Sequence, residues 1–411
     1  MSEFFEVVTP KEGIKRLLSK KNFPIMVSEK INTVNSDSRI LSQDIKSSLN
    51  LPHFNRSSMD GYAIYANDSN GVSLSNPNYL EIIEEIKMGD VPKQKILTGK
   101  TSRIFTGGMI PEGSNAVIME EDTEELGNNM IEIKKPVSIG ENIIFSGEET
   151  KKGKIIIKKG TKIRSQEIGS LLESGFTEIC VSKKPIIGVL SSGDELISPE
   201  KTLELGKIRD INTYTISNLI NNSGGVPKIF PILPDDLNSQ LNQAKKALQF
   251  CDMLIFSAGS SISYRDTTAE VINSLDKPGV IVHGISVKPG KPTILGLSGK
   301  KPIIGLPGNP VSSIMIFINI VKPILDKLNN HISIITKQID CILTEDINSQ
   351  TGREDYVQVS ISSTAQKTLA TPVFGKSNLI NTLVNSDGFI TIPPETGGLY
   401  KNSLVKVKTY E

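Results

Sequence analysis

The stretch "PIIGLPGNPVSSIMIF", residues 302–317, decides the fold class of this chain. It opens as an apolar run, breaks at Gly-Leu-Pro-Gly-Asn-Pro, and resumes at once as a second apolar pattern. Asn309 is a good N-cap residue and Pro310 suits the first helical position, so we expect a buried strand followed by a helix over about 310–328. Direct strand-to-helix junctions of this kind are typical of parallel sheets with helical crossovers.

The same alternation extends through residues 182–328. Apolar runs such as "PIIGVLS" at 185–191 and "DMLIFSAG" at 252–259 alternate with helical patterns, which predicts a doubly wound parallel sheet. Residues 46–145 contain short alternating runs separated by Asn, Gly, Asp and Pro, which predicts a β domain. Residues 329–411 contain five short strand patterns and predict a small β-barrel. We therefore expect a multi-domain α/β protein.

Composition narrows the classes of function. The 46 Lys and Arg residues balance 45 Asp and Glu, so no overall electric field attracts nucleic acid or a membrane. No apolar run approaches the roughly 20 residues that span a bilayer, and the N-terminus lacks a signal-peptide pattern. Cys180, Cys251 and Cys341 are too widely spaced for a disulfide framework, which is typical of a reducing compartment. We expect a cytoplasmic protein whose function depends on local sites.

The strand–helix junction has the features of an anion site. Ligands of open parallel sheets bind beyond the carboxyl ends of the strands, where Gly308 allows close backbone approach and the helix offers free N–H groups. A helix dipole contributes only about 0.3–2 kcal/mol, whereas micromolar binding requires about 8 kcal/mol. The nearby turn "SVKPGKPTIL" adds Lys288 and Lys291, two cations that can converge on an oxyanion. For the junction alone, an ordinary capped turn is the alternative.

Acidic residues follow several of the predicted strands. Glu195 comes soon after the strand at 186–190, Asp235 follows "VPKIFPI", and Asp266 closes "SAGSSISYRD". In a doubly wound sheet these carboxylates gather at one edge, where Mg²⁺ can join one or two of them to substrate phosphates. The histidines are isolated, so we expect structural roles for them rather than a zinc site: His53, His283 and His331.

A second group of unusual stretches lies in the predicted β domain. "LPHFNRSSMDGYAIYA", residues 51–66, brings an arginine, two serines and Asp60 together, and "FTGGMIPEGSNAVIMEED", residues 105–122, places Thr106 at a strand end. A simple β-turn at Asp60–Gly61 is the alternative, but it does not explain so many polar residues. If both stretches are functional, the site is shared between domains or subunits.

Together these motifs resemble one family, the molybdopterin molybdenumtransferases of the MoeA type, which are related to the E domain of gephyrin. Each motif is weak alone, but the combination is specific and runs in family order through nearly the whole chain. The matching stretches are "LPHFNRSSMDGYAI", "TGGMIPEGSNAVIMEE", "SGEE", "SSGDEL", "GKIRDIN", "PDD", "SAGSSISYRD", "KPGKP" and "GLPGNPVSS".

The resemblance implies four domains and an elongated homodimer. The active cleft is expected between the doubly wound domain of one subunit and the inserted domain of the other. The expected domains are a discontinuous first domain (1–45 and 146–181), an inserted β domain (46–145), a doubly wound molybdopterin-binding domain (182–328) and a C-terminal β-barrel (329–411).

The resemblance also implies a reaction. Family members take adenylylated molybdopterin and molybdate, with Mg²⁺, release AMP and leave molybdenum on the dithiolene sulfurs, so the molybdopterin adenylyltransferase is an expected partner. By motif match, the catalytic positions are Asp60, Glu149, Glu195, Asp235, Asp266, Lys288 and Lys291, with the metal on Glu195, Asp235 and Asp266. The matching substrate-binding positions are Thr106, Ser192, Gly193, Gly259, Ser260, Ser261, Pro307, Gly308, Asn309 and Pro310.

Several positions depart from the family pattern. Glu149 replaces an aspartate, and Ile144 replaces an arginine that is common there. Ala258 and Ser263 alter a glycine-rich run, and a positive φ at Ser263 would be strained. Two alternatives therefore share this fold: a tungstate-handling paralogue and a molybdopterin-binding scaffold without catalysis. The related adenylylating enzyme shares only the region 185–328.

Overall fold

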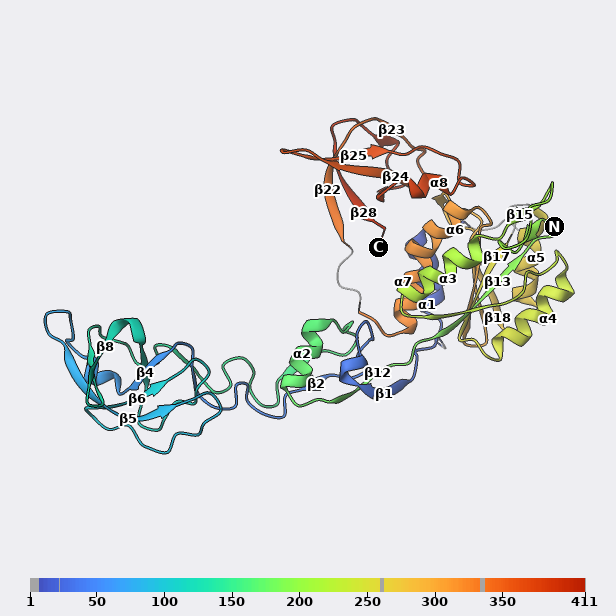
Figure 1. Ribbon diagram of the computed structural model, residues 1–411. Coiled ribbons are helices and arrows are strands. Elements are labelled where there is room, and N and C mark those ends of the chain that lie inside the picture. Colours follow the sequence, from blue (N-terminus) through green and yellow to red (C-terminus); the bar gives the residue numbers. More distant parts are fainter. Residues whose placement is uncertain (1–6, 22, 259–261, 333–336, 411) are drawn as a thin grey trace. The chain divides into compact units, whose positions relative to one another are not determined.

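The computed structural model describes residues 7–21, 23–258, 262–332 and 337–410, with only the backbone for residues 258 and 262–266. The chain divides into two compact units, whose helices and strands are shown in Figure 1. The inserted unit comprises residues 43–159 and 165–177, and the sheet-and-barrel unit comprises residues 1–42, 160–164 and 178–411.

The sheet-and-barrel unit contains a mixed six-stranded sheet. Its strand order is β16 (Val226–Ile229), β13 (Ile186–Ser192), β17 (Met253–Ala258), β21 (Lys301–Leu306), β20 (Ile294–Ser298) and β18 (Pro278–His283). The first four strands are parallel, which confirms the predicted doubly wound sheet. The last two are antiparallel to their neighbours, which was not predicted. Only residues 299–300 join β20 to β21, and so short a link permits a hairpin but no crossover.

Helices cover both faces of this sheet because successive side chains of a strand point to opposite faces. In β13, Val189 shares a core with α1 (Pro10–Leu18), α3 (Asn212–Asn222), α6 (Pro310–Ile316) and α7 (Lys322–Leu328). The next residue, Leu190, shares a core with α4 (Leu237–Leu248) and α5 (Ile262–Asn273). The predicted helix over 310–328 is continuous, with a π-helical segment, Phe317–Val321, joining α6 to α7.

The C-terminal strands form a closed barrel, as predicted. The strands pair in the order β24 (Glu354–Ser363), β25 (Thr368–Pro372), β22 (Gln338–Leu343), β28 (Leu404–Thr409) and β26 (Gly388–Ile392), and β26 pairs again with β24. The two-residue strand β19 (Val287–Lys288) adds to β24 in parallel. Tyr356 and Phe389 belong to the same apolar core as α6 and α7, so the barrel packs against the sheet region.

Short elements complete this unit. β1 (Ser28–Asn32) pairs with β12 (Glu178–Ser182), β14 (Leu196–Ile197) with β15 (Ile208–Arg209), and β23 (Ile347–Asn348) with β27 (Gly398–Leu399), while α8 (Asn381–Val384) precedes β26. In the described part of the chain, no helix combines the length and the apolar character needed to cross a membrane.

The inserted unit is built on a second six-stranded sheet. Its order is β7 (Ala116–Met119), β4 (Gly61–Ile64), β6 (Lys100–Ile104), β5 (Asn78–Ile86), β9 (Met130–Ile133) and β8 (Thr123–Gly127). Two short strand pairs and one helix complete the unit. β3 (Arg56–Ser57) pairs with β10 (Ile143–Ile144), β2 (Ile45–Lys46) pairs with β11 (Ile155–Ile157), and the helix is α2 (Ser165–Glu173). β4 and β7 approach so closely that a Cβ atom on Gly61 would lie 2.0 Å from the carbonyl oxygen of Ile118. Only glycine fits there, immediately after Asp60.

Candidate active site

The carboxyl ends of three parallel strands meet at one edge of the six-stranded sheet. Ser192 of β13 pairs in register with Ala258 of β17, and Ser257 pairs with Leu306 of β21. The loops after these strands therefore begin side by side, where open sheets bind ligands. Several predicted site residues lie outside the described part of the chain: Gly259, Ser260, Ser261 and the side chain of Asp266.

The turn from Pro307 to Pro310 starts α6 as expected, but Asn309 does not cap it with its side chain. Its backbone has the extended N-cap conformation (φ −68°, ψ 127°), and Pro310 is the first helical residue. The Asn309 amide instead donates to Ser377 Oγ at 2.9 Å, and the Val311 N–H donates to the Ser377 carbonyl at 3.1 Å. Asn309 is therefore the N-cap residue, as predicted, but its side chain makes no capping hydrogen bond, because the Ser377 carbonyl after the barrel strand β25 accepts from the Val311 N–H that a cap would bond.

The Lys-Pro-Gly-Lys-Pro turn is held between the barrel and α6. Lys288 lies opposite Asp355 in the β19–β24 pairing. Gly290 has φ +120°, and a Cβ atom there would lie 2.4 Å from Ile316 Cδ1 of α6. Both the left-handed backbone and this close contact require glycine. Lys288 and Lys291 are exposed on either side of the fixed turn.

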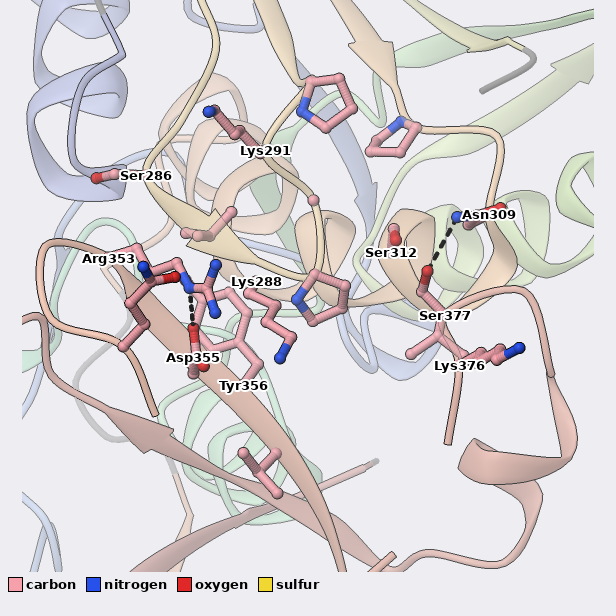
Figure 2. Close-up of a pocket in the computed structure, with 18 of the residues that line it drawn as sticks. Ser286, Lys288, Lys291, Asn309, Ser312, Arg353, Asp355, Tyr356, Lys376 and Ser377 are labelled. Atoms are coloured by element: carbon pink, nitrogen blue, oxygen red, sulfur yellow. Dashed lines mark hydrogen bonds and ion pairs between the residues drawn. The ribbon is translucent and has the colours of Figure 1, made fainter. Parts of the chain in front are cut away.

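A cavity of about 1110 Å³ opens between these two turns and the barrel loops. Pro307, Gly308 and Asn309 line it, together with four basic side chains that Figure 2 shows around it: Lys288, Lys291, Arg353 and Lys376. The one acidic side chain among the described lining residues is Asp355, which is 4% exposed and accepts a 2.8 Å bond from Arg353 Nε. The paired Asp355 leaves the cavity with a positive charge.

No sequence motif predicts the barrel side of this cavity. Arg353 follows a Thr-Gly turn before β24, while Lys376 and Ser377 follow the exposed Phe-Gly pair after β25. Such polar turns are common, so no local signal distinguishes them. Contacts between residues more than 60 positions apart bring them to the cavity: the β19–β24 pairing for Arg353, and the bonds from Asn309 and Val311 to Ser377 for the loop after β25.

The predicted carboxylates form a separate group at the same sheet edge. Ser192 bridges to Leu233, whose carbonyl accepts a 3.1 Å bond from the Gly193 N–H. Glu195 folds back over Gly193, because a Cβ atom on that glycine would lie 2.6 Å from Glu195 Oε2. The exposed Asp235 follows two residues after Leu233. Gly193 lines a second cavity of about 710 Å³, whereas Glu195 and Asp235 do not line the cationic cavity.

The "RDIN" segment braces the strand ends. The buried carboxylate of Asp210 accepts bonds from Ser191 Oγ and Thr213 Oγ1, both at 2.6 Å. The Asn212 amide donates to Ser257 Oγ at 3.0 Å and to the Gly308 carbonyl at 2.8 Å. Asn212 thus sets the spacing between the loops after β17 and β21.

In the inserted unit, the structure brings two predicted stretches together. Asp60 Oδ1 accepts bonds from the Thr106 N–H at 2.7 Å and from its hydroxyl at 2.8 Å. These two hydrogen bonds hold the pKa of Asp60 below its usual value. Glu149 is also exposed in this unit, and its N–H donates to the Leu51 carbonyl at 3.1 Å. Asp60 is therefore an oriented, ionised carboxylate.

Two departures from the family pattern look different in the structure. Ile144 lies directly opposite Arg56 in the β10–β3 pair, and opposite residues of antiparallel strands share a face. Arg56 thus places a cation on the same face of the strand pair as Ile144, which replaces the arginine common in the family. Ser263 is the second residue of α5, where serine adopts helical φ without strain, so the expected strain does not arise.

The predicted carboxylates at the strand ends fit a Mg²⁺ site only if substrate phosphates supply the remaining ligands. In the described residues, no three His, Cys, Asp or Glu side chains are grouped closely enough to hold a metal. Mg²⁺ prefers carboxylate oxygens and commonly takes one or two of them with substrate phosphates. Glu195 and Asp235 follow adjoining strand ends and are the candidates for such a site, while the Asp266 side chain lies outside the described residues.

Comparison with known proteins gives matches along nearly the whole chain. The MoeA N-terminal region (domain I and II) matches residues 8–175, a "Probable molybdopterin binding domain" matches 188–327, and the MoeA C-terminal region (domain IV) matches 340–410.

Similar proteins carry the same names. A curated molybdopterin molybdenumtransferase of Staphylococcus epidermidis is 32% identical over 97% of this chain and 95% of its own length. One of Bacillus subtilis is 30% identical over 90% of this chain and 86% of its own length. A crystal structure of the molybdopterin biosynthesis MoeA protein from Pyrococcus horikoshii OT3 has a TM-score of 0.86 and 30% identity, and the match covers 98% of this chain and 100% of that one.

Proposed function

The chain belongs to the MoeA family and is an enzyme of molybdenum cofactor biosynthesis, and we propose that it inserts molybdenum into molybdopterin by Mg²⁺-dependent cleavage of adenylylated molybdopterin. The substrates in this proposal are adenylylated molybdopterin and molybdate. Water cleaves one P–O bond of the link between the two phosphates, which gives AMP and the phosphate monoester of molybdopterin. The two dithiolene sulfurs replace two oxygens of molybdate, which leave as water, and the product is the molybdenum cofactor.

The cationic cavity is the observation that carries this proposal. Molybdate and the pyrophosphate link are both oxyanions, and a cavity of about 1110 Å³ has room for a ligand with several anionic groups. Lys288 and Lys291 would neutralise oxyanion charge from the turn, and Arg353 would do so from the barrel. Fixed cations placed where charge develops are the main source of catalysis in phosphoryl transfer.

The carboxylates at the strand ends would hold the metal ion. Glu195 and Asp235, with Asp266, are the residues that we propose for Mg²⁺. When bound, the ion supplies charge neutralisation and orientation of the phosphate oxygens. The Glu195 carboxylate lies close to Gly193, where no side chain occupies the space.

We propose that the active protein is a homodimer and that Asp60, Thr106 and Glu149 act on a ligand bound by the partner copy. Asp60 supports this idea because it is exposed and held in its ionised form. We further place the reaction in the cytoplasm, with the molybdopterin adenylyltransferase as the source of substrate. The four domain boundaries expected from the sequence remain part of the proposal.

The test is AMP release from adenylylated molybdopterin, measured with and without molybdate and with and without Mg²⁺. The proposal predicts release that requires both. Tungstate in place of molybdate tests the tungstate-handling alternative in the same assay. Tight ligand binding with no AMP release under any condition contradicts the proposal and identifies a molybdopterin-binding scaffold.

A further inference from the structure

A third cavity, of about 370 Å³, lies at the opposite edge of the six-stranded sheet. Lys184 lines it two residues before β13 begins, and Gly224 lines it two residues before β16. It is therefore at the amino ends of the parallel strands, whereas the candidate active site is at their carboxyl ends. All of its described lining residues belong to the sheet-and-barrel unit.

The lining of this amino-edge cavity is strongly basic. Its charged side chains are Arg39, Lys162, Lys184 and Lys322 against a single carboxylate, Asp326, which gives a net charge of 4 − 1 = +3 with His331 neutral. Asp326 is 14% exposed and already has two partners, Lys322 Nζ at 3.0 Å and His331 Nδ1 at 2.9 Å. The carboxylate that would repel an anion is therefore neutralised in place.

Two of the lysines are uncommitted. Arg39 pairs with Glu29 and donates to the Ser182 carbonyl at 2.8 Å, so it forms part of the wall. Lys162 and Lys184 are exposed, and no ion pair is recorded for either among the described residues. Like charges converging on one small cavity repel each other unless an anion lies between them.

Neutral donors and a strained loop complete the lining. Asn221, Asn222 and Ser223 come from the C-terminal end of α3, and Asn329 is 4% exposed at the cavity wall. Ser38 lines the cavity with φ +60°, a conformation that non-glycine residues adopt rarely, and its N–H donates to the Ile163 carbonyl at 2.8 Å. Backbone strain of this kind is often found at ligand sites.

We propose that the amino-edge cavity is a second oxyanion site, which binds a tetrahedral dianion such as inorganic phosphate or the phosphate group of a small metabolite. Lys162 and Lys184 bind the anion oxygens as point charges, and the amide and hydroxyl groups fix its orientation. The partial negative charge at the C-terminal end of α3 opposes this binding, but it amounts to about half a charge against the two uncommitted lysines. This site is independent of the proposed reaction.

Isothermal titration calorimetry of the full chain with inorganic phosphate tests the proposal, at constant ionic strength maintained with chloride. The cationic active-site cavity also binds oxyanions, so the measurement uses the Lys288→Ala/Lys291→Ala variant as its background. We expect the Lys288→Ala/Lys291→Ala variant to bind phosphate saturably. Combining it with Lys162→Ala/Lys184→Ala should weaken the phosphate affinity by at least about tenfold. Glycerol 3-phosphate, titrated in parallel, distinguishes free phosphate from a phosphate ester as the preferred ligand.

Lys183→Ala is the matched control, because Lys183 is also exposed and neighbours Lys184 but does not line the cavity. It should leave phosphate affinity unchanged. Absence of binding in the Lys288→Ala/Lys291→Ala background overturns the proposal, as does equal loss in the Lys183 variant. Lys162→Ala/Lys184→Ala in the otherwise native chain should retain AMP release, so failure of the proposed reaction does not affect this result.

Discussion

The Asp60 turn of the inserted unit and the cationic cavity of the sheet-and-barrel unit position charged groups in opposite ways. Asp60 is fixed within one sheet, by two hydrogen bonds from Thr106 at the end of the neighbouring strand. The cavity is assembled over long range, by a two-residue strand that pairs with the barrel and a glycine pressed against α6. Both halves of the Asp60 arrangement lie in recognisable sequence motifs, whereas only the Lys288 half of the cavity does.

The largest effect should come from Glu195→Gln. This change removes the negative charge but retains the size of the side chain, so we expect AMP release to fall by about 10²-fold or more, the usual scale for one preorganised electrostatic group. Initial rates measure the effect, and circular dichroism checks that the fold is intact. Activity close to that of the unchanged protein would show that the carboxylate of Glu195 takes no part in the reaction at the cationic cavity.

Lys288→Ala tests the cavity itself. A hydrogen bond to a charged group is worth about 1.5–3 kcal/mol, so we expect a loss in kcat/KM of roughly 10- to 100-fold. Lys300→Ala is the control, since Lys300 is an exposed lysine in the hairpin between β20 and β21. Equal losses in both variants would mean that only the general charge of the unit matters.

Gly61→Ala tests the backbone behind the Asp60 turn. The added Cβ would lie 2.0 Å from the Ile118 carbonyl oxygen, so we expect the inserted unit to lose about 1–3 kcal/mol in free energy of unfolding. Urea denaturation measures this loss. Gly169→Ala in α2 is a control of opposite sign, because its added Cβ would meet no atom within 4 Å beyond its chain neighbours and the backbone of its own helix, and alanine favours a helix. Equal stability of both variants would contradict the close β4–β7 approach.

The smallest effect concerns the ionisation of Asp60. The folded state lowers its pKa, so its hydrogen bonds stabilise the fold at pH values above the unfolded pKa and are lost as the pH falls through the lowered one. Thr106→Val removes the hydroxyl donor but retains the N–H, and should raise the pKa of Asp60 toward its ordinary value. A carboxyl NMR titration measures the shift. An unchanged pKa would mean that the backbone donor alone orients this carboxylate.

Features carried by a short run or motif of the sequence were predicted, whereas features that depend on contacts between distant residues were missed. The parallel strands and the five barrel strands were predictable because each is a short apolar run between turn residues. The antiparallel edge, β20 and β18, was missed because the two-residue link between β20 and β21 looks like an ordinary loop as long as the pairing of the strands on either side is unknown. At the site, Lys288 and Gly308 were found in motifs, whereas Arg353 and Ser377 depend on where the barrel packs. The N-cap position of Asn309 was predicted, but its side-chain bond to Ser377 depends on the same barrel packing.

The position of α1 sets an order in time. Its residue Leu17 belongs to the core formed with Leu295 and Ile324, which are made about 300 residues later. At roughly 5–20 residues per second, this helix waits about 15–60 s during synthesis before its partners exist. The inserted unit contains no residue beyond 177 and can be complete long before then. A ribosome making this protein therefore carries a finished middle segment while its first helix is still without a partner.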